Sequence, residues 1–361
     1  MSPREKQIVG LVSFAIFAVV VLVVPAFIGA FRAQQLAYVG IYLIALLGLN
    51  ILTGYTGQIS LGHGAFMAIG GYTTAILMAG NEQYGQEGVL AVSGGMKDVW
   101  TIPIAGLVAG IAGLLFGLPA LRLSGLYLAL ATFAIAVALP SALKRFEEFT
   151  GGGSGINLFG IPELTAGISP VEIFGRELVF NDWLYYLCWS IALVLFGVAW
   201  LILRGRTGLA FRAVRDSETA AVSSGVSLAQ YKTLAFGISA AYAGVAGSLF
   251  AIATTFVNPD TFPIALSIFL LVGVVVGGLG GLAGLVFGAI FIQFLPLWAQ
   301  GEGVFSRLPG FIVDRTKEPG APAIIYGVVL ILLMFFLPNG VGGLFRRVGQ
   351  ALTRRRYSRT A

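Results

Sequence analysis

The chain has 361 residues, of which 57% are hydrophobic and 11% are charged, whereas an ordinary globular domain has about 25% charged residues. This composition excludes an ordinary soluble enzyme and predicts a membrane protein. The net charge of +6 reflects membrane topology, since the basic residues gather in the inner segments, and does not indicate nucleic-acid binding. The single cysteine, Cys188, excludes an intramolecular disulfide and a metal site built from several cysteines.

Long runs without Asp, Glu, Lys or Arg define the predicted elements. These runs cover residues 7–31, 33–81, 99–121, 123–143, 183–203, 233–257, 261–301 and 319–345. A spanning helix needs about 20 apolar residues, so the 33–81 and 261–301 runs each hold two spans. The expected spans lie near residues 8–31, 35–53, 64–80, 101–121, 124–143, 184–203, 229–257, 263–277, 280–300 and 321–338.

The predicted fold class is therefore an all-α integral membrane protein, a polytopic bundle of about ten transmembrane helices in one domain over residues 1–361. The N-terminal run imitates a signal peptide. Its apolar part is longer than the 7–15 residues of such a signal, and no clear small-residue cleavage site follows it. We therefore expect an uncleaved first span.

A polar, glycine-rich segment interrupts the second run at residues 50–66. Irregular backbone at membrane depth is tolerated only where protein or a wet cavity covers it. One interpretation is a re-entrant or broken helix that lines a translocation path, and the other is a turn at the inner surface. The candidate path residues are Asn50, Thr56, Gln58, Ser60 and His63. For His63, the only histidine, a structural hydrogen bond is weighed against gating or proton sensing.

Two further regions leave alternatives open. The long outer loops, with the glycine-rich residues 151–155, either form a docking rim for an extracytoplasmic partner or connect spans passively. The glycines at 277–281, with Gly273, Gly284 and Gly288, indicate either close helix packing or a substrate loop. The two short spans that flank this loop could also be half-helices that do not fully cross.

The polar turn at residues 205–229 predicts a short amphipathic helix over 211–224 that stops at Gly225. Charged residues stand at helical spacing as the pairs Arg212–Asp216 and Arg215–Glu218, each contributing about 0.2–0.5 kcal/mol to an isolated helix. An apolar side is expected from Ala213, Ala220, Ala221 and Val222. Such a helix either docks a soluble partner or lies on the membrane surface without one.

The distribution of basic residues predicts the orientation. With the N-terminus inside and ten alternating spans, the inner segments hold 14 of the 22 basic residues and only Glu5, Asp216 and Glu218 among the acidic ones. By the positive-inside rule both termini are cytoplasmic. We expect a multi-pass membrane protein whose basic tail, residues 346–361, contacts anionic lipid.

The sequence contains no phosphate-binding loop and no Asp, Glu, Lys or Arg near the centre of an expected span. Energy for uphill transport would then come from another subunit, and the inner helix is where that subunit would dock. The alternatives are a secondary transporter that works without ATP and a membrane enzyme. An enzyme should carry a charged or metal-binding cluster within the membrane, and the sequence shows none.

Several motifs resemble one known family. They are Gly-Gln-Ile-Ser-Leu-Gly-His-Gly-Ala-Phe at 57–66, Leu-Arg-Leu-Ser-Gly-Leu-Tyr-Leu-Ala-Leu at 121–130, Phe-Thr-Gly-Gly-Gly-Ser-Gly at 149–155, and the stretches 205–226 and 231–247. Together they are similar to the bacterial permeases of branched-chain amino acid ABC transporters, M-type subunit, over about residues 35–345. Related permeases for urea or short amides share much of this pattern.

The resemblance implies a multi-pass transport subunit of a bacterial inner membrane with no cofactor of its own. ATP and Mg would be bound by two cytoplasmic ATPase subunits, and the other partners would be a homologous second permease and an extracytoplasmic substrate-binding protein. It implies that the inner helix couples the permease to an ATPase. The residues assigned to this coupling are Arg212, Arg215, Asp216, Glu218 and Gly225. The loop at 80–100 is longer than the resemblance leads us to expect.

Overall fold

The architecture is taken from a computed structural model. It describes residues 15, 17–79, 95–123, 125–159, 161, 164, 171–173, 176–299, 324, 327–329, 331–332, 335 and 340–343. The predicted first span at 8–31 is described over residues 15 and 17–31, whereas most of the last span at 321–338 and of the loop at 80–100, and all of the tail at 346–361, lie outside these residues.

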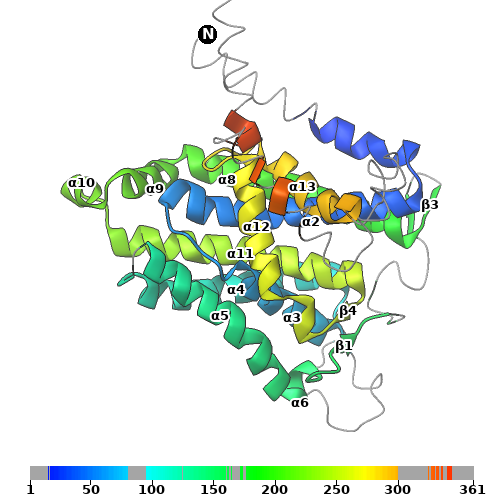
Figure 1. Cartoon of the computed structure of the whole chain (residues 1–361). Helices are drawn as coiled ribbons and strands as arrows, with labels where there is room; N and C mark the ends of the chain where they lie inside the picture. Colours follow the sequence, from blue (N-terminus) through cyan, green and yellow to red (C-terminus); the bar gives the residue numbers. More distant parts are fainter. Residues whose placement is uncertain are drawn as a thin grey trace, which may run out of the picture.

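Helices dominate the described chain. The spans predicted from 35–53 to 280–300 each correspond to one helix (Figure 1). In order these are α2 (Ala30–Leu49, extended by the π-helix η2, Asn50–Tyr55), α3 (His63–Met78), α4 (Asp98–Ala120), α5 (Leu126–Arg145), α8 (Phe180–Arg204), α11 (Leu228–Thr254), α12 (Ile264–Gly277) and α13 (Leu285–Ala299). A 3-10 helix, η1 (Val24–Phe27), precedes α2.

Six described helices are long and apolar enough to cross a membrane, counting η2 with α2 and η4 with α12. The other two are shorter, with 16 residues in α3 and 15 in α13. At 1.5 Å per residue, α13 is about 22 Å long, less than the roughly 30 Å of a bilayer core. The predicted span 280–300 is thus too long, because residues 278–284 form a turn ahead of the helix.

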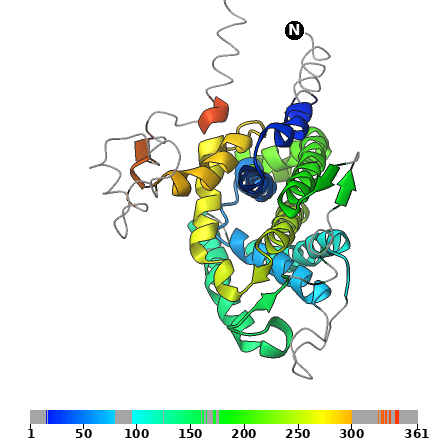
Figure 2. The ribbon, with the colours of Figure 1, turned by 90° about the vertical axis from the view of Figure 1, so that its right-hand side faces the viewer.

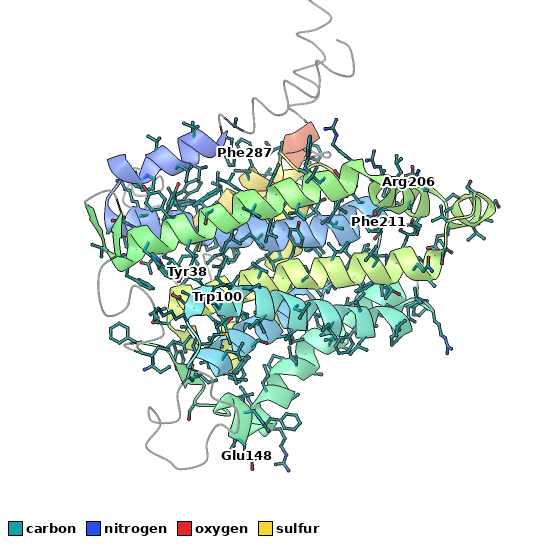
Figure 3. The ribbon with its side chains drawn as sticks, turned by 180° about the vertical axis from the view of Figure 1, so that it is seen from behind. Tyr38, Trp100, Glu148, Arg206, Phe211 and Phe287 are labelled. Atoms are coloured by element: carbon teal, nitrogen blue, oxygen red, sulfur yellow. The ribbon has the colours of Figure 1, made fainter. Side chains whose placement is uncertain are left out.

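The helix ends sort into two groups at opposite ends of the bundle. The short helices α9 (Arg206–Asp216) and α10 (Glu218–Ser223) lie at one end, whereas α6 (Glu147–Thr150) lies at the other (Figure 1). Figure 3 shows the same separation, with Arg206 and Phe211 far from Trp100 and Glu148. The chain thus crosses the bundle repeatedly, as the alternating apolar runs predict.

The core is built around α2 and α11. In each of these helices, 78% of the most apolar stretch is buried inside the protein. Helix α2 packs against α8, α11, α12 and α13, and Figure 2, which looks along the bundle, shows it enclosed by other helices. Small residues bring α11 close to its neighbours. Gly70 of α3 faces the backbone of Gly244, where an added methyl group would overlap with it. Small residues at such crossings let helix backbones approach closely.

Glycines also join α12 to α13. A side chain at Gly284 would overlap with the carbonyl of Gly277, and one at Gly288 with the carbonyl of Gly273. Among the two interpretations of these glycines, the structure therefore supports close helix packing.

The described residues also form two small antiparallel pairs of strands, which the all-helical prediction did not include. Strand β1 (Ile156–Asn157) pairs with β4 (Phe256–Val257), and β2 (Val171–Ile173) pairs with β3 (Arg176–Leu178). The β1–β4 pair forms where α11 ends at Thr254, so the predicted span 229–257 ends three residues too late. The glycine-rich residues 151–155 form turns that lead into β1.

An ion pair between Lys144 Nζ and Asp260 Oδ1, 2.9 Å apart, links the end of α5 to the 3-10 helix η4 (Pro259–Thr261) ahead of α12. Both side chains are largely exposed, with relative exposures of 45% and 71%. The pair therefore contributes little more than about 0–1 kcal/mol. The β1–β4 pairing and this contact place the C-terminal end of α5 beside the start of α12.

Candidate functional site

The polar segment after α2 begins as a π-helix. Such single turns of wider helix are rare and frequently lie at functional sites. The π-helix ends at Tyr55, and residues 57–62 then form no regular structure before α3 begins at His63. Gly57 has φ +73°, a left-handed conformation that favours glycine, and here the chain reverses its direction.

The reversed segment runs back alongside α2 into the bundle. The backbone N–H of Gln58 donates to the carbonyl of Leu52 (3.2 Å), and Thr53 Oγ1 donates to the carbonyl of Gln58 (3.2 Å). Farther along, His63 Nε2 donates to the carbonyl of Ala45 (2.9 Å). Ala45 precedes Tyr55, the end of the π-helix, by ten residues, so the start of α3 is tied to a part of α2 that lies before the π-helix.

This geometry bears on the two interpretations of the segment. A turn lying on the inner surface would leave its polar side chains exposed, whereas His63 is buried and bonds to Ala45, about one helical turn before α2 gives way to the π-helix. Gln58, Ser60 and His63 are 6%, 1% and 1% exposed, whereas Gly57 and Ile59 face outward. The segment is therefore a broken helix covered by protein, which is the condition for irregular backbone at membrane depth.

Two neighbouring helices hold the broken helix from the other side. The backbone N–H of Leu61 donates to Thr132 Oγ1 of α5 (2.9 Å), and the N–H of Gly64 donates to Ser267 Oγ of α12 (2.9 Å). Within the segment, Gln58 Nε2 donates to Thr56 Oγ1 (3.1 Å), which itself donates to the carbonyl of Leu52 (2.5 Å). The backbone groups freed by the helix break thus find partners on α5 and α12.

His63 makes the structural hydrogen bond that was one of its two expected roles. Because its Nε2 donates to a carbonyl, the neutral ring carries no proton on Nδ1, and Nδ1 is buried without a hydrogen-bond partner. This contact ties the start of α3 to α2.

Asn50 occupies a different place from the other candidate path residues. Its side chain is fully buried, and its Oδ1 accepts from the backbone N–H of Gly280 (3.0 Å) while its Nδ2 donates to the carbonyl of Gly281 (3.1 Å). Both glycines belong to the turn between α12 and α13. Asn50 therefore holds this turn against the π-helix.

Two helices, α9 and α10, lie where one coupling helix was predicted. Helix α9 begins at Arg206, five residues earlier than expected, and the helical path breaks at Ser217, whose backbone is extended. Ser217 then caps α10, with its Oγ accepting from the N–H of Ala220 (3.3 Å). Serine favours such caps because its hydroxyl competes for nearby backbone groups. The helical segment stops at Ser223, and Gly225 follows with φ +81°, as the predicted stop at this glycine requires.

The charged side chains of α9 and α10 make other contacts than the two expected ion pairs. Arg212 does not pair with Asp216, because its Nη2 donates to the carbonyl of Leu203 (2.7 Å) at the end of α8. Asp216 instead accepts from its neighbour Arg215 (3.2 Å). Glu218 pairs with Lys232 of α11, with Oε1 and Nζ 2.7 Å apart. The extended residue at 217 separates Arg215 from Glu218, whereas Arg212 and Asp216 share α9 and do not pair with each other because Arg212 bonds to Leu203.

The buried side of α9 and α10 also differs from the prediction. It is formed by Gly208, Phe211, Val214 and Ala221, with Phe211 fully buried and packed edge-on against Tyr231 of α11 (ring centroids 6.2 Å apart). Ala220 and Val222, expected on the apolar side, are exposed. The exposed surface of the pair thus combines Val222 and Leu209 with polar residues.

Sequence reasoning missed the contact that joins the two candidate regions. Arg215 Nη1 donates to the carbonyl of Gly54 (2.8 Å) in the π-helix, so α9 is bonded directly to the broken helix. It also missed Thr132, Ser267 and Lys232 as partners. The polar composition of the segment was a signal that the sequence did offer for the region of the π-helix. Its bonding partners gave no such signal, because backbone carbonyl acceptors leave no pattern in a sequence.

Comparison with known proteins identifies the family. Residues 31–338 match the family described as "Branched-chain amino acid transport system / permease component". The chain belongs to this permease family. The match covers the broken helix, α9 and α10, and both flanking halves of the bundle.

The relatives of this permease include the high-affinity branched-chain amino acid transport system permease protein LivM of Escherichia coli, 36% identical over 317 residues, which are 83% of this chain and 67% of the relative. The LivM protein of Salmonella typhimurium is 37% identical over 318 residues, with the same coverage. A probable LivM of Methanocaldococcus jannaschii is 22% identical over 328 residues, covering 85% of this chain and 91% of the relative. No solved structure matches the chain.

Proposed function

We propose that this chain is the membrane-spanning permease subunit of an ABC importer for branched-chain amino acids. The observation that carries this proposal is the match to the permease family over residues 31–338. Family membership favours this function over a self-sufficient carrier or a membrane enzyme. In the proposed complex, a homologous second permease completes the path, two ATPase subunits dock at α9 and α10, and an extracytoplasmic binding protein delivers the substrate.

The geometry supports ATPase docking at α9 and α10. The two helices project at one end of the bundle (Figure 1), and their exposed surface holds apolar side chains, Leu209 (61% exposed) and Val222 (54%), beside the charged Asp216. Their inner side is fixed to α8, α11 and the π-helix. Because α9 and α10 are bonded to the bundle on their inner side, a movement of a docked ATPase would be passed on to α8, α11 and the π-helix.

Reconstitution of the complete complex in proteoliposomes tests this function. We expect uptake of leucine, isoleucine or valine that requires ATP inside the vesicles, the ATPase subunits and the binding protein outside. The matched competitors are urea and acetamide, which would be carried instead by a permease of the related amide class. Uptake by the permease without ATPase subunits would contradict the proposal and favour a secondary transporter.

We further propose that the inward side of the broken helix contributes to the translocation path through Thr56, Gln58, Ser60 and His63. Replacing Gln58 with leucine keeps the side-chain size and removes the hydrogen bond to Thr56. Uptake should fall several-fold while the complex still assembles. Ile59→Leu is the matched control, because Ile59 lies one residue away and faces outward. Equal uptake by Gln58→Leu and the parent would return Gln58 to a structural role.

The proposed orientation places both termini and the α9–α10 end in the cytoplasm. Among the described residues, Arg122, Arg204, Arg206 and Arg215 adjoin helix ends on the α9–α10 side, in keeping with the positive-inside rule. Reporter fusions after Ser217 and Arg356 should give a cytoplasmic signal, and fusions after Gly88 and Gly155 an outer one. An outer signal at Ser217 would invert the arrangement and remove α9–α10 as an ATPase site.

A further inference from the structure

Arg215 connects α9 to the π-helix at the end of α2. Its Nη1 donates to the carbonyl of Gly54 (2.8 Å), one of the last carbonyls of a helix that have no partner within the helix itself. The side chain is 40% exposed, so the guanidinium lies at the edge of the bundle and its contact with Gly54 is part-buried. A hydrogen bond from a charged donor is stronger than one between neutral groups.

The turn between α12 and α13 meets the same place. A Cβ atom added to Gly280 would lie 3.2 Å from Arg215 Nη1 and 3.3 Å from the carbonyl oxygen of Gly54. Gly280 has φ +72°, so glycine is required there for its backbone conformation as well as for this close approach. Three segments that are far apart in the sequence therefore converge on one guanidinium.

Asn50 fixes the turn from the other side of the π-helix. Its amide bonds both Gly280 and Gly281, and the side chain is fully buried. A buried amide that satisfies two backbone groups of a glycine turn restrains a segment that otherwise has few side chains to hold it. Losing Asn50 would leave a backbone donor and an acceptor without their partner, a change that costs more than the hydrogen bonds themselves contribute.

We propose that Arg215 and Asn50 are positioning residues that make α9, the π-helix of α2 and the α12–α13 turn move as one unit during transport. Arg215 ties α9 to the π-helix, and Asn50 ties the π-helix to the turn. The broken helix continues directly from the π-helix, so a displacement of α9 reaches residues 57–63 through this unit. The inference rests on the proposed function for its role in transport, but the physical tie exists independently of it.

Spin-label distances in the assembled complex test the tie. One label replaces Leu209, exposed on α9, and the other replaces Leu279, 49% exposed in the α12–α13 turn, in a chain with Cys188→Ala. We expect one narrow distance distribution in the parent that is the same without nucleotide and in the ATP-trapped state. Arg215→Gln and Asn50→Ala should broaden or shift this distribution and should lower the uptake per ATP hydrolysed.

Three matched variants separate positioning from other effects. Arg215→Lys keeps a charged donor and should restore part of the parent behaviour. Arg206→Gln removes the same charge from an exposed position of the same helix and should leave the distance unchanged. Thr74→Val removes a buried hydrogen bond to Ser248 between α3 and α11 and should lower stability without changing the distance.

Two results would overturn the proposal. The first is an Arg215→Gln complex with the distances and the coupling ratio of the parent. The second is a lower coupling ratio with unchanged distances, which would mean that Arg215 contacts the ATPase directly. Failure of the proposed function would look different, because the parent itself would show no ATP-dependent uptake while the nucleotide-free distances could still be compared.

Discussion

Substituting Gly244 with valine is expected to prevent the bundle from closing. A Cβ atom at this position would lie 2.6 Å from the carbonyl oxygen of Ala105 and would overlap with the methyl group of Ala109, both on α4. On the other side, Gly70 of α3 packs against the backbone of Gly244, so α11 cannot shift away from α4 without meeting α3. Overpacking of this kind costs about 1–3 kcal/mol, and more where backbone must move.

The measurement is the yield of monodisperse complex in detergent and its thermal stability. Gly197→Val is the matched control, since Gly197 also lies within a long helix and has open space where its Cβ would be. We expect the Gly244 variant to lose most of its folded yield and the Gly197 variant to resemble the parent. Equal stability of the two variants would show that α4 and α11 do not pack as described.

The second large effect is expected at the ion pair between Glu218 and Lys232. Lys232 is 8% exposed and Glu218 is 49% exposed. Glu218→Lys would place a second positive charge beside an already buried ammonium group. We expect a local cost of about 1–3 kcal/mol, between the small contribution of an exposed pair and the larger penalty for breaking a buried one. Helix α10 should then detach from α11, and uptake should be lost while the chain still inserts.

A charge swap distinguishes this structural pair from a contact with the ATPase. The double variant Glu218→Lys with Lys232→Glu restores the attraction, so it should recover uptake in part if the pair holds α10 in place. Asp216→Lys is the control for surface charge, because Asp216 is 69% exposed and pairs only with its neighbour Arg215 among the contacts described for it. No recovery in the double variant, with uptake also lost in Asp216→Lys, would instead indicate direct electrostatic docking.

Some features of this protein could be predicted from the sequence because they depend on local composition. A run of about 20 apolar residues must be helical in a bilayer, where backbone groups find no water. The positions of α2 to α13, the polar interruption after α2 and the stop at Gly225 follow from this rule and from glycine chemistry. The motifs around residues 57–66 and 205–247 also indicated the family correctly.

Helix continuity across the inner turn could not be read in the same way. The charges at 212, 215, 216 and 218 fit one helix as well as two, and the outcome depends on whether Ser217 caps or continues. Serine does either at little cost, so the packing of Phe211 against Tyr231 and the pairing of Glu218 with Lys232 decide it.

The tertiary structure alone decided where the polar segment lies and what its neighbours bond. Its depth depends on the contact of His63 with the carbonyl of Ala45, and its link to α9 depends on Arg215 reaching the carbonyl of Gly54. Every residue carries a carbonyl, so a side chain that donates to the backbone has no complementary residue type to search for. The sequence by itself thus determined which segments form apolar helices and which residues are polar. The packing of helices distant in sequence determined which of those polar residues meet.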